Sequence, residues 1–243
     1  MKILLDMGHC LSGADTGAVG NGKTEQQCTR EIGYKVKSKL EALGHTVIVC
    51  SCDSAKSVGE SLAYRVNKAN SNGGDIYISI HLNAGGGHGT EIYTWGGKPF
   101  TEASKVLDNI VGLGYRNRGI KDGSNLYVIR NTKMKSMLIE CCFMDSKTDM
   151  GKYNAEAFAN AIVKGITGQS IKEVNTAPKY DESIPESNSI FKIPGTTGYI
   201  EQATDGRLII HKDRGNYIAI GKGFIDCYWN DNKGNNGKKR ISK

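Results

Sequence analysis

Over residues 1–169, short apolar runs alternate with amphipathic segments of helical period. The apolar runs at 2–7, 45–52, 75–80, 90–95 and 136–142 predict strands, and the segments at 24–43, 57–72, 98–115 and 152–167 predict helices. Thr24 stands where it would cap the first helix. Strands that alternate with helices of this length are typical of a mostly parallel sheet covered on both faces. We therefore expect an α/β fold, a three-layer α/β/α sandwich.

The pattern changes beyond residue 169. Pro178, Pro185 and Pro194, three of the four prolines, fall in or next to a stretch rich in Ser and Asn, which is typical of a linker. After it, short strand-like runs are separated by the turn signals TDG, DRG and GKG. The sequence predicts a first domain at 1–169, a linker at 170–188 and a small all-β module at 189–243.

The composition narrows the class of protein. Hydrophobic residues make up 38% and charged residues 23% of the chain, and no apolar run is long enough to span a membrane. The net charge of +7 favours an anionic partner, which could be nucleic acid, a membrane surface or an acidic wall polymer. The cations are scattered through both parts of the chain, so nucleic acid is not expected as the partner. The seven cysteines include no CxxC pair, and we expect buried thiols rather than a cysteine zinc site or disulfides.

Two predicted strands each lead into a histidine. His9 follows the strand at 2–7, and His81 follows the strand at 75–80. Parallel strands present their carboxyl ends at one edge of a sheet, so the two imidazoles would meet there and offer nitrogen ligands to a metal. Glu25, in the first turn of the first helix, is the best third ligand, with Glu31 as a competitor. The alternative for Glu25 is a carboxylate stabilised by the helix dipole alone.

Glu140 interrupts an otherwise apolar strand, SMLIECC. A carboxylate in such a place is costly to bury unless it is paired, protonated or used in chemistry. One reading is a buried salt bridge to an arginine such as Arg65. The other is a general base whose pKa is raised by its surroundings.

Four motifs in this order, MGHC, TEQQ, ISIHLNA and LIECCF, resemble those of a known family. With the ESLAYRVNKAN helix before the third and RGIKDGSNLYVIRN before the fourth, residues 1–168 resemble the zinc-dependent N-acetylmuramoyl-L-alanine amidases of the amidase-3 group, found in autolysins and phage endolysins. The resemblance implies a three-layer α/β/α fold. It also implies that His9, Glu25 and His81 bind one Zn²⁺ and that Glu140 is the catalytic glutamate.

The expected function is zinc-dependent cleavage of the amide between N-acetylmuramic acid and L-alanine in bacterial peptidoglycan, causing wall lysis as an endolysin does. The 189–243 module would bind peptidoglycan or associated wall polymers. The first residues lack a signal-peptide pattern, so we expect synthesis in the host cytoplasm and holin-dependent release. Alternatives are a metallopeptidase of the stem peptide and an inactive wall-binding protein. The sequence does not indicate an oligomeric state.

Overall fold

The computed structural model describes residues 1–169 in full and the backbone of six strands between residues 190 and 242. The chain divides into two compact units, Met1–Val174 and Asn175–Lys243. The predicted linker at 170–188 lies outside the described residues. Every candidate site residue lies in the first unit.

The first unit is built on a six-stranded sheet with the order β5-β1-β7-β10-β8-β9. Its strands are β1 Lys2–Met7, β5 Thr46–Val49, β7 Ile76–Asn83, β8 Thr90–Thr94, β9 Asn117–Asp122 and β10 Lys135–Phe143. All neighbours pair in parallel except β10 and β8, so β8 and β9 run against the other four. The prediction of a mainly parallel sheet is confirmed.

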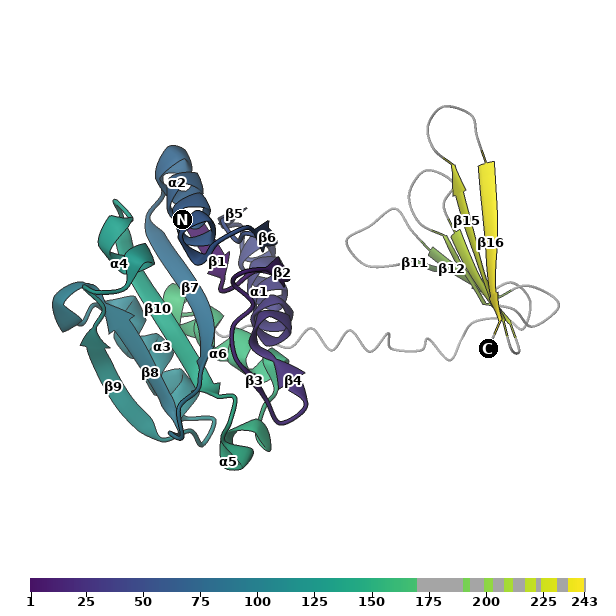
Figure 1. The fold of residues 1–243 in the computed structure, drawn as a ribbon. Coiled ribbons are helices and arrows are strands. Elements are labelled where there is room, and N and C mark those ends of the chain that lie inside the picture. Colours follow the sequence, from purple (N-terminus) through teal and green to yellow (C-terminus); the bar gives the residue numbers. More distant parts are fainter. Residues whose placement is uncertain are drawn as a thin grey trace. The chain divides into compact units, whose positions relative to one another are not determined.

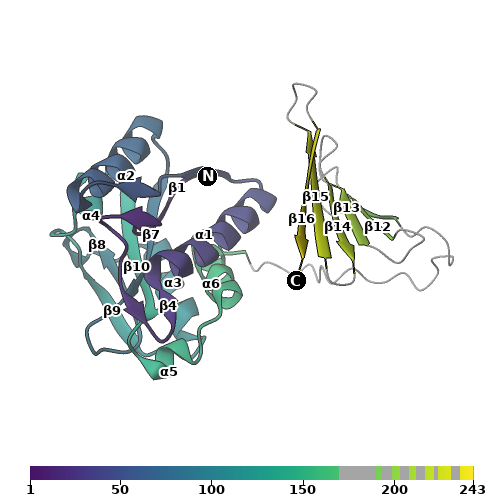
Figure 2. The ribbon, with the colours of Figure 1, turned by 45° about the vertical axis from the view of Figure 1, so that its right-hand side comes forward.

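Helices cover both faces of this sheet (Figure 1, Figure 2). On one face, α1 Glu25–Ala42, α3 Thr101–Val111 and α6 Ala155–Thr167 pack over the larger core cluster. On the other, α2 Val58–Asn72 and α4 Tyr127–Asn131 pack over a smaller cluster that includes Tyr77 and Leu138. The short helices η1 Trp95–Gly97 and α5 Lys147–Met150 lie in connections. The arrangement has three layers, α/β/α, and every helix in the described residues is too short or too polar to serve as a membrane span.

The face under α2 and α4 is covered only in part. Side chains two residues apart on a strand point to the same side, so His81 lies on this face beyond Tyr77, and Glu140 lies beyond Leu138. The helices pack against Tyr77 and Leu138, nearer the amino ends of β7 and β10. The part of this face near the carboxyl ends of β7 and β10 is therefore left uncovered by α2 and α4, and the site lies there.

The connection from β1 to α1 contains two small ribbons. β2 Ser12–Gly13 pairs with β6 Ser54–Ala55, and β3 Val19–Gly20 pairs with β4 Lys23–Thr24. Thr24 is at the N-cap position of α1, but its side chain does not cap the helix, so that prediction is wrong. The Glu25 amide donates to the Ala18 carbonyl at 2.8 Å, so the loop before β3 satisfies the first helical N–H.

Six cysteines lie in the described residues, and all are free and buried. They are Cys10, Cys28, Cys50, Cys52, Cys141 and Cys142. The prediction of buried thiols is confirmed for this part of the chain.

The second unit contains an antiparallel sheet whose strands pair in sequence order, β11 to β16. The strands are β11 Ile190–Lys192, β12 Tyr199–Gln202, β13 Leu208–His211, β14 Tyr217–Gly221, β15 Phe224–Asn230 and β16 Asn236–Ser242. The wall-binding role expected of residues 189–243 depends on side chains outside the described part. It stays a prediction.

Candidate metal centre and active site

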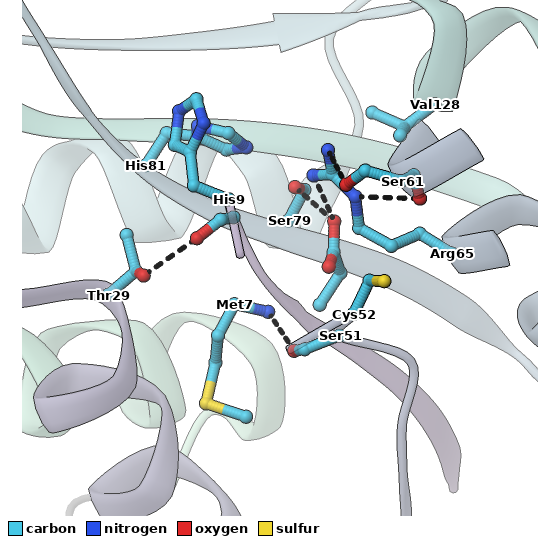
Figure 3. Close-up of polar contacts among 12 residues, drawn as sticks. Met7, His9, Thr29, Ser51, Cys52, Ser61, Arg65, Ser79, His81 and Val128 are labelled. Atoms are coloured by element: carbon cyan, nitrogen blue, oxygen red, sulfur yellow. Dashed lines mark hydrogen bonds and ion pairs between the residues drawn. The ribbon is translucent and has the colours of Figure 1, made fainter. Parts of the chain in front are cut away.

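His9, Glu25 and His81 come together at the carboxyl edge of the sheet. β1 and β7 are adjacent and parallel, with Met7 paired to Ile80, so the residues that follow emerge side by side. His9 stands two residues after β1, and His81 lies inside β7, which extends beyond the predicted end at residue 80 to Asn83. The two rings meet edge to face with centroids 4.8 Å apart (Figure 3). One potential ligand atom from each of the three residues lies within 4.8 Å of the others.

Gly8 allows the two histidines to approach. A β-carbon built on Gly8 would lie 2.2 Å from the Nε2 atom of His81, a separation that real atoms do not adopt. His9 itself has a φ of 65°, in the left-handed region that few residues other than glycine enter. Strained backbone of this kind is common at functional sites, where surrounding structure must hold it.

The Glu25 carboxylate lies between the two imidazoles. Its Oε1 atom is 3.1 Å from His9 Nε2 and 3.1 Å from His81 Nδ1. The amides of Leu82 and Ala18 donate to its two oxygens at 3.0 and 2.9 Å. Burial raises the pKa of Glu25, but the hydrogen bonds from the two histidines outweigh that effect and hold the pKa well below its ordinary value. The carboxylate is therefore ionised and fixed in place.

Asp15 orients His9. Its Oδ1 atom accepts a hydrogen bond from His9 Nδ1 at 2.6 Å. Burial raises the pKa of Asp15, but the bonds from His9 and Ser61 lower it to about 2, so this carboxylate only accepts. His9 Nδ1 must then carry the proton, and Nε2 is the nitrogen directed at Glu25. Burial lowers the pKa of His9, but Asp15 and Glu25 together raise it to about 9.

A buried network holds Asp15 in turn. Its Oδ2 atom accepts from Ser61 at 2.6 Å and from Arg65 at 2.8 Å. Arg65 also faces Asp6 at 3.4 Å, and Figure 3 shows it beside Ser61 and Ser79. The alternative that Arg65 pairs with Glu140 is wrong, because Arg65 is paired with Asp6 and Asp15 instead. The sequence reasoning missed Asp15, whose only signal was an acidic residue in the Gly-rich loop after His9.

If His9, Glu25 and His81 hold the Zn²⁺ expected from the sequence, Asp15→Asn should weaken its binding about 10–100-fold, as loss of a carboxylate behind a ligating histidine usually does. The amide cannot hold the His9 ring as an ionised acceptor would. Competition with a chromogenic chelator would give the dissociation constant. Asp75→Asn is the control, because Asp75 accepts from the Lys2 amide at the far end of the sheet. Equal zinc affinity in Asp15→Asn and wild type would contradict the orienting role.

Glu140 lies next to the three residues. In the sheet it is paired with His81 of β7 on one side and Glu91 of β8 on the other, so the three side chains share one face. Its Oε2 atom is buried and has no hydrogen-bond partner in the described residues. Burial, reinforced by the negative charges of Glu25 and Glu91, raises the pKa of Glu140 to about 8. An unpaired carboxyl with a raised pKa is typical of a proton-transferring group.

Glu31, the competing carboxylate, and three other polar residues lie outside this centre. Glu31 is exposed and accepts from the Tyr153 hydroxyl at 3.0 Å. His45 faces the amino terminus at 3.2 Å, and His88 is exposed on a loop. Asn83 accepts from the Ala84 amide at 2.7 Å, which supports the loop after β7. None of these four is part of the three-residue cluster.

The donor set fits a divalent transition metal. Two imidazoles and one carboxylate are a common protein contribution to a catalytic zinc site, in which three protein ligands leave a position open. The His81 Nε2 atom is buried and meets no partner in the described residues, which is costly unless something else satisfies it. His9, Glu25 and His81 could therefore hold one such ion.

Comparison with known proteins gives concordant matches. The chain is 36% identical over 170 residues to the N-acetylmuramoyl-L-alanine amidase CwlM of Bacillus licheniformis, covering 68% of this chain and 65% of that protein. It is 32% identical over 193 residues to the endolysin of Bacillus phage SPP1, covering 76% of this chain and 70% of that one. The chain thus spans slightly less than two thirds of the length of CwlM.

Among solved structures, the catalytic domain of the CD27L endolysin, described as targeting Clostridia Difficile, superposes with a TM-score of 0.64. The identity is 31%, over 70% of this chain and 99% of that one. The family model Amidase_3, described as N-acetylmuramoyl-L-alanine amidase, matches residues 3–172, more than half of the 243 residues. The chain therefore belongs to the Amidase_3 family of N-acetylmuramoyl-L-alanine amidases.

Proposed function

We propose that this protein hydrolyses the amide bond between N-acetylmuramic acid and L-alanine in bacterial peptidoglycan. The observation that carries the proposal is the convergence of His9, Glu25 and His81 beside the unpartnered Glu140 carboxyl. The family and the amidase relatives support the choice of bond. Zn²⁺ is the proposed metal, since a set of two histidines and one glutamate suits it.

The residues divide the chemistry between them. Zinc bound by His9, Glu25 and His81 would polarise the scissile carbonyl and lower the pKa of a water molecule into the neutral range. Glu140 takes the proton from the attacking water and gives it to the departing alanine nitrogen. Asp15 keeps His9 Nε2 aimed at the centre, and the amides of Ala18 and Leu82 keep Glu25 there. The raised pKa of Glu140 makes its ionised form a stronger base toward the attacking water and favours the protonated form that then supplies the alanine nitrogen.

A lytic role is the second part of the proposal. An endolysin and an endolysin catalytic domain are among the similar proteins, which supports an enzyme that opens the wall during lysis. The substrate would be whole peptidoglycan, and the unit at Asn175–Lys243 would hold the enzyme on the wall. A tethered binding unit raises the local concentration of an insoluble substrate.

The decisive experiment counts chain ends released from purified peptidoglycan. Amino-terminal L-alanine should appear without new reducing sugar ends, a chelator should suppress it, and added Zn²⁺ should restore it. A different new amino terminus would identify a stem-peptide peptidase instead. Binding to the wall with no new ends of any kind would identify an inactive wall-binding protein.

A further inference from the structure

The neighbour of Glu140 in the sheet, Glu91 of β8, is the centre of a second polar cluster. Glu91 is 1% exposed, and two cations reach its Oε2 atom: Arg118 through Nε and Lys121 through Nζ, each at 2.5 Å. Its Oε1 atom accepts from the Tyr93 hydroxyl at 2.8 Å and from Asn83 Nδ2 at 2.9 Å. Four donors satisfy this buried carboxylate, so it is a fixed support for the two cations.

A β-bulge brings the two cations to one face of the sheet. The flanking pairs of β8 and β9 are Thr90 with Asn117 and Ile92 with Ile120. Between them Glu91 alone opposes both Arg118 and Gly119, so β9 carries one extra residue. Gly119 has a φ of 86°, which a residue with a side chain rarely adopts. In a regular strand Arg118 and Lys121, three residues apart, would point to opposite faces.

The cluster lies beside the proposed site of catalysis. Glu91 pairs with Glu140, which pairs with His81, so the three form a row across β8, β10 and β7. Figure 1 shows β10 between β7 and β8, with β9 at the edge of the sheet. Adjacent strands are about 4.8 Å apart. The cations that reach over to Glu91 therefore stand about one strand away from Glu140.

This cluster has more positive than negative charge. Two cations on one carboxylate leave a net positive charge, and Tyr93 and Asn83 are neutral donors. Arg118 donates to Glu91 through Nε only, and its terminal nitrogens have no hydrogen-bond partner in residues 1–169. Its side chain is 27% exposed, and that of Lys121 is 36% exposed. The guanidinium also lies 4.8 Å from the centroid of the Phe143 ring, which steadies its plane. A planar guanidinium whose terminal N–H groups remain available is suited to binding a carboxylate.

We propose that Arg118, assisted by Lys121, binds the free carboxylate of the stem-peptide residue that follows L-alanine. This subsite rests on the proposed amidase function. In that substrate the muramyl carboxyl is consumed in the scissile amide, so the nearest free carboxylate lies on the peptide side. One residue spans about 3.5 Å, so a carboxylate on the next residue can reach a group one strand from Glu140. The subsite would select stem peptides in which this carboxyl is free rather than amidated.

The test compares two synthetic substrates in which the γ-carboxyl is blocked as a methylamide: N-acetylmuramoyl-L-alanyl-D-glutamate, whose α-carboxyl is free, and the matching isoglutamine compound, whose α-carboxyl is an amide. The wild type should cleave the carboxylate compound with a kcat/KM about tenfold or more above that of the amide, as expected for a charge-assisted hydrogen bond. Arg118→Gln should remove this preference, chiefly through KM on the carboxylate compound, so that both compounds are cleaved with nearly the same kcat/KM. Arg118→Lys should keep part of the preference, because lysine keeps the positive charge but lacks the planar guanidinium.

Lys37→Gln is the control, since Lys37 pairs with Glu41 on the surface of α1, and it should keep the full preference. An equal fall on both substrates in Arg118→Gln would show a purely structural arginine and overturn the subsite. So would a wild type that does not distinguish the two compounds, or that digests whole peptidoglycan but neither compound. Absence of alanine termini from whole peptidoglycan would instead overturn the proposed function, and the subsite with it.

Discussion

Glu140→Gln is expected to lower the rate of amide hydrolysis by about 10²–10⁴-fold, the usual contribution of a positioned general base. Glutamine has nearly the same shape but cannot take a proton from water. Zinc content should equal that of the wild type, because Glu140 is outside the three-residue cluster. The measurements are alanine-terminus release and metal content of the purified protein.

The same variant should alter stability in a defined pH window. Its surroundings raise the pKa of folded Glu140 to about 8, whereas the unfolded chain has the ordinary value of 4.5. Between those values the unfolded chain releases a proton that the folded protein retains, so the free energy of unfolding falls as pH rises. Glutamine does not titrate in this range, so the variant does not lose stability in this way. In chelator-treated protein, Glu140→Gln should therefore gain melting temperature over the wild type at pH 8 relative to pH 5.

Glu31→Gln is the matched control for both measurements. Glu31 lies on α1 and is exposed, and it was the competing carboxylate in the sequence. It should keep activity, zinc and the wild-type pH dependence. Normal turnover by Glu140→Gln would remove Glu140 from its proposed role. A constant difference in melting temperature from pH 5 to pH 8 would contradict the raised pKa.

His81→Ala should abolish stoichiometric zinc binding and, with it, detectable hydrolysis. The change removes one of three protein donors, and the remaining two cannot complete the site. The ring also contacts Gly8 and donates to Glu25 at 3.1 Å, so its loss frees the other two ligands to move. Metal analysis after dialysis would measure the zinc, and thermal melting with and without added Zn²⁺ would report binding independently. Zinc should raise the melting temperature of the wild type and leave that of the variant unchanged.

His88→Ala is the control for His81→Ala, since His88 is an exposed histidine on the loop that follows β7. It should bind zinc as the wild type does. Similar melting temperatures of the chelated wild type and chelated His81→Ala would show that the variant folds. Unchanged zinc content in a folded His81→Ala protein would place the metal elsewhere.

Much of the fold follows from local pattern. The strand at residues 2–7 and the helix starting at Ser57 were predicted within a residue, because each has a strong period or a capping side chain, as in the Ser57 bond from the Glu60 amide. β9 was missed because its sequence, NRGIKD, is polar. It is an edge strand, and two of its charged side chains bind Glu91 on the neighbouring strand β8. The reversed direction of β8 was also not predicted, since a short apolar run has no directional signal.

The candidate centre likewise contains some residues that the sequence indicates and others that it does not. His9, His81 and Glu140 stand out along the chain because each polar residue ends or interrupts an apolar run, and an unpaired polar group there is costly. Asp15 and Glu91 have no such signal, because an acidic residue in a loop or near the start of a short strand is ordinary in a sequence. Their meaning comes from partners far along the chain, Arg65 for Asp15 and Arg118 for Glu91.

Residue type and spacing alone thus predict an α/β domain, the edge of its sheet where His9 and His81 meet, and candidate ligands for a metal there. They do so because apolar periodicity and the cost of burying charge act locally. The supporting shell depends on contacts between residues 27 to 50 positions apart, such as Arg118 with Glu91 and Arg65 with Asp15. Strand order, the bulge at Gly119 and the part of the sheet left open by α2 and α4 set those contacts. These features arise only when the whole chain packs, because each depends on which strands become neighbours.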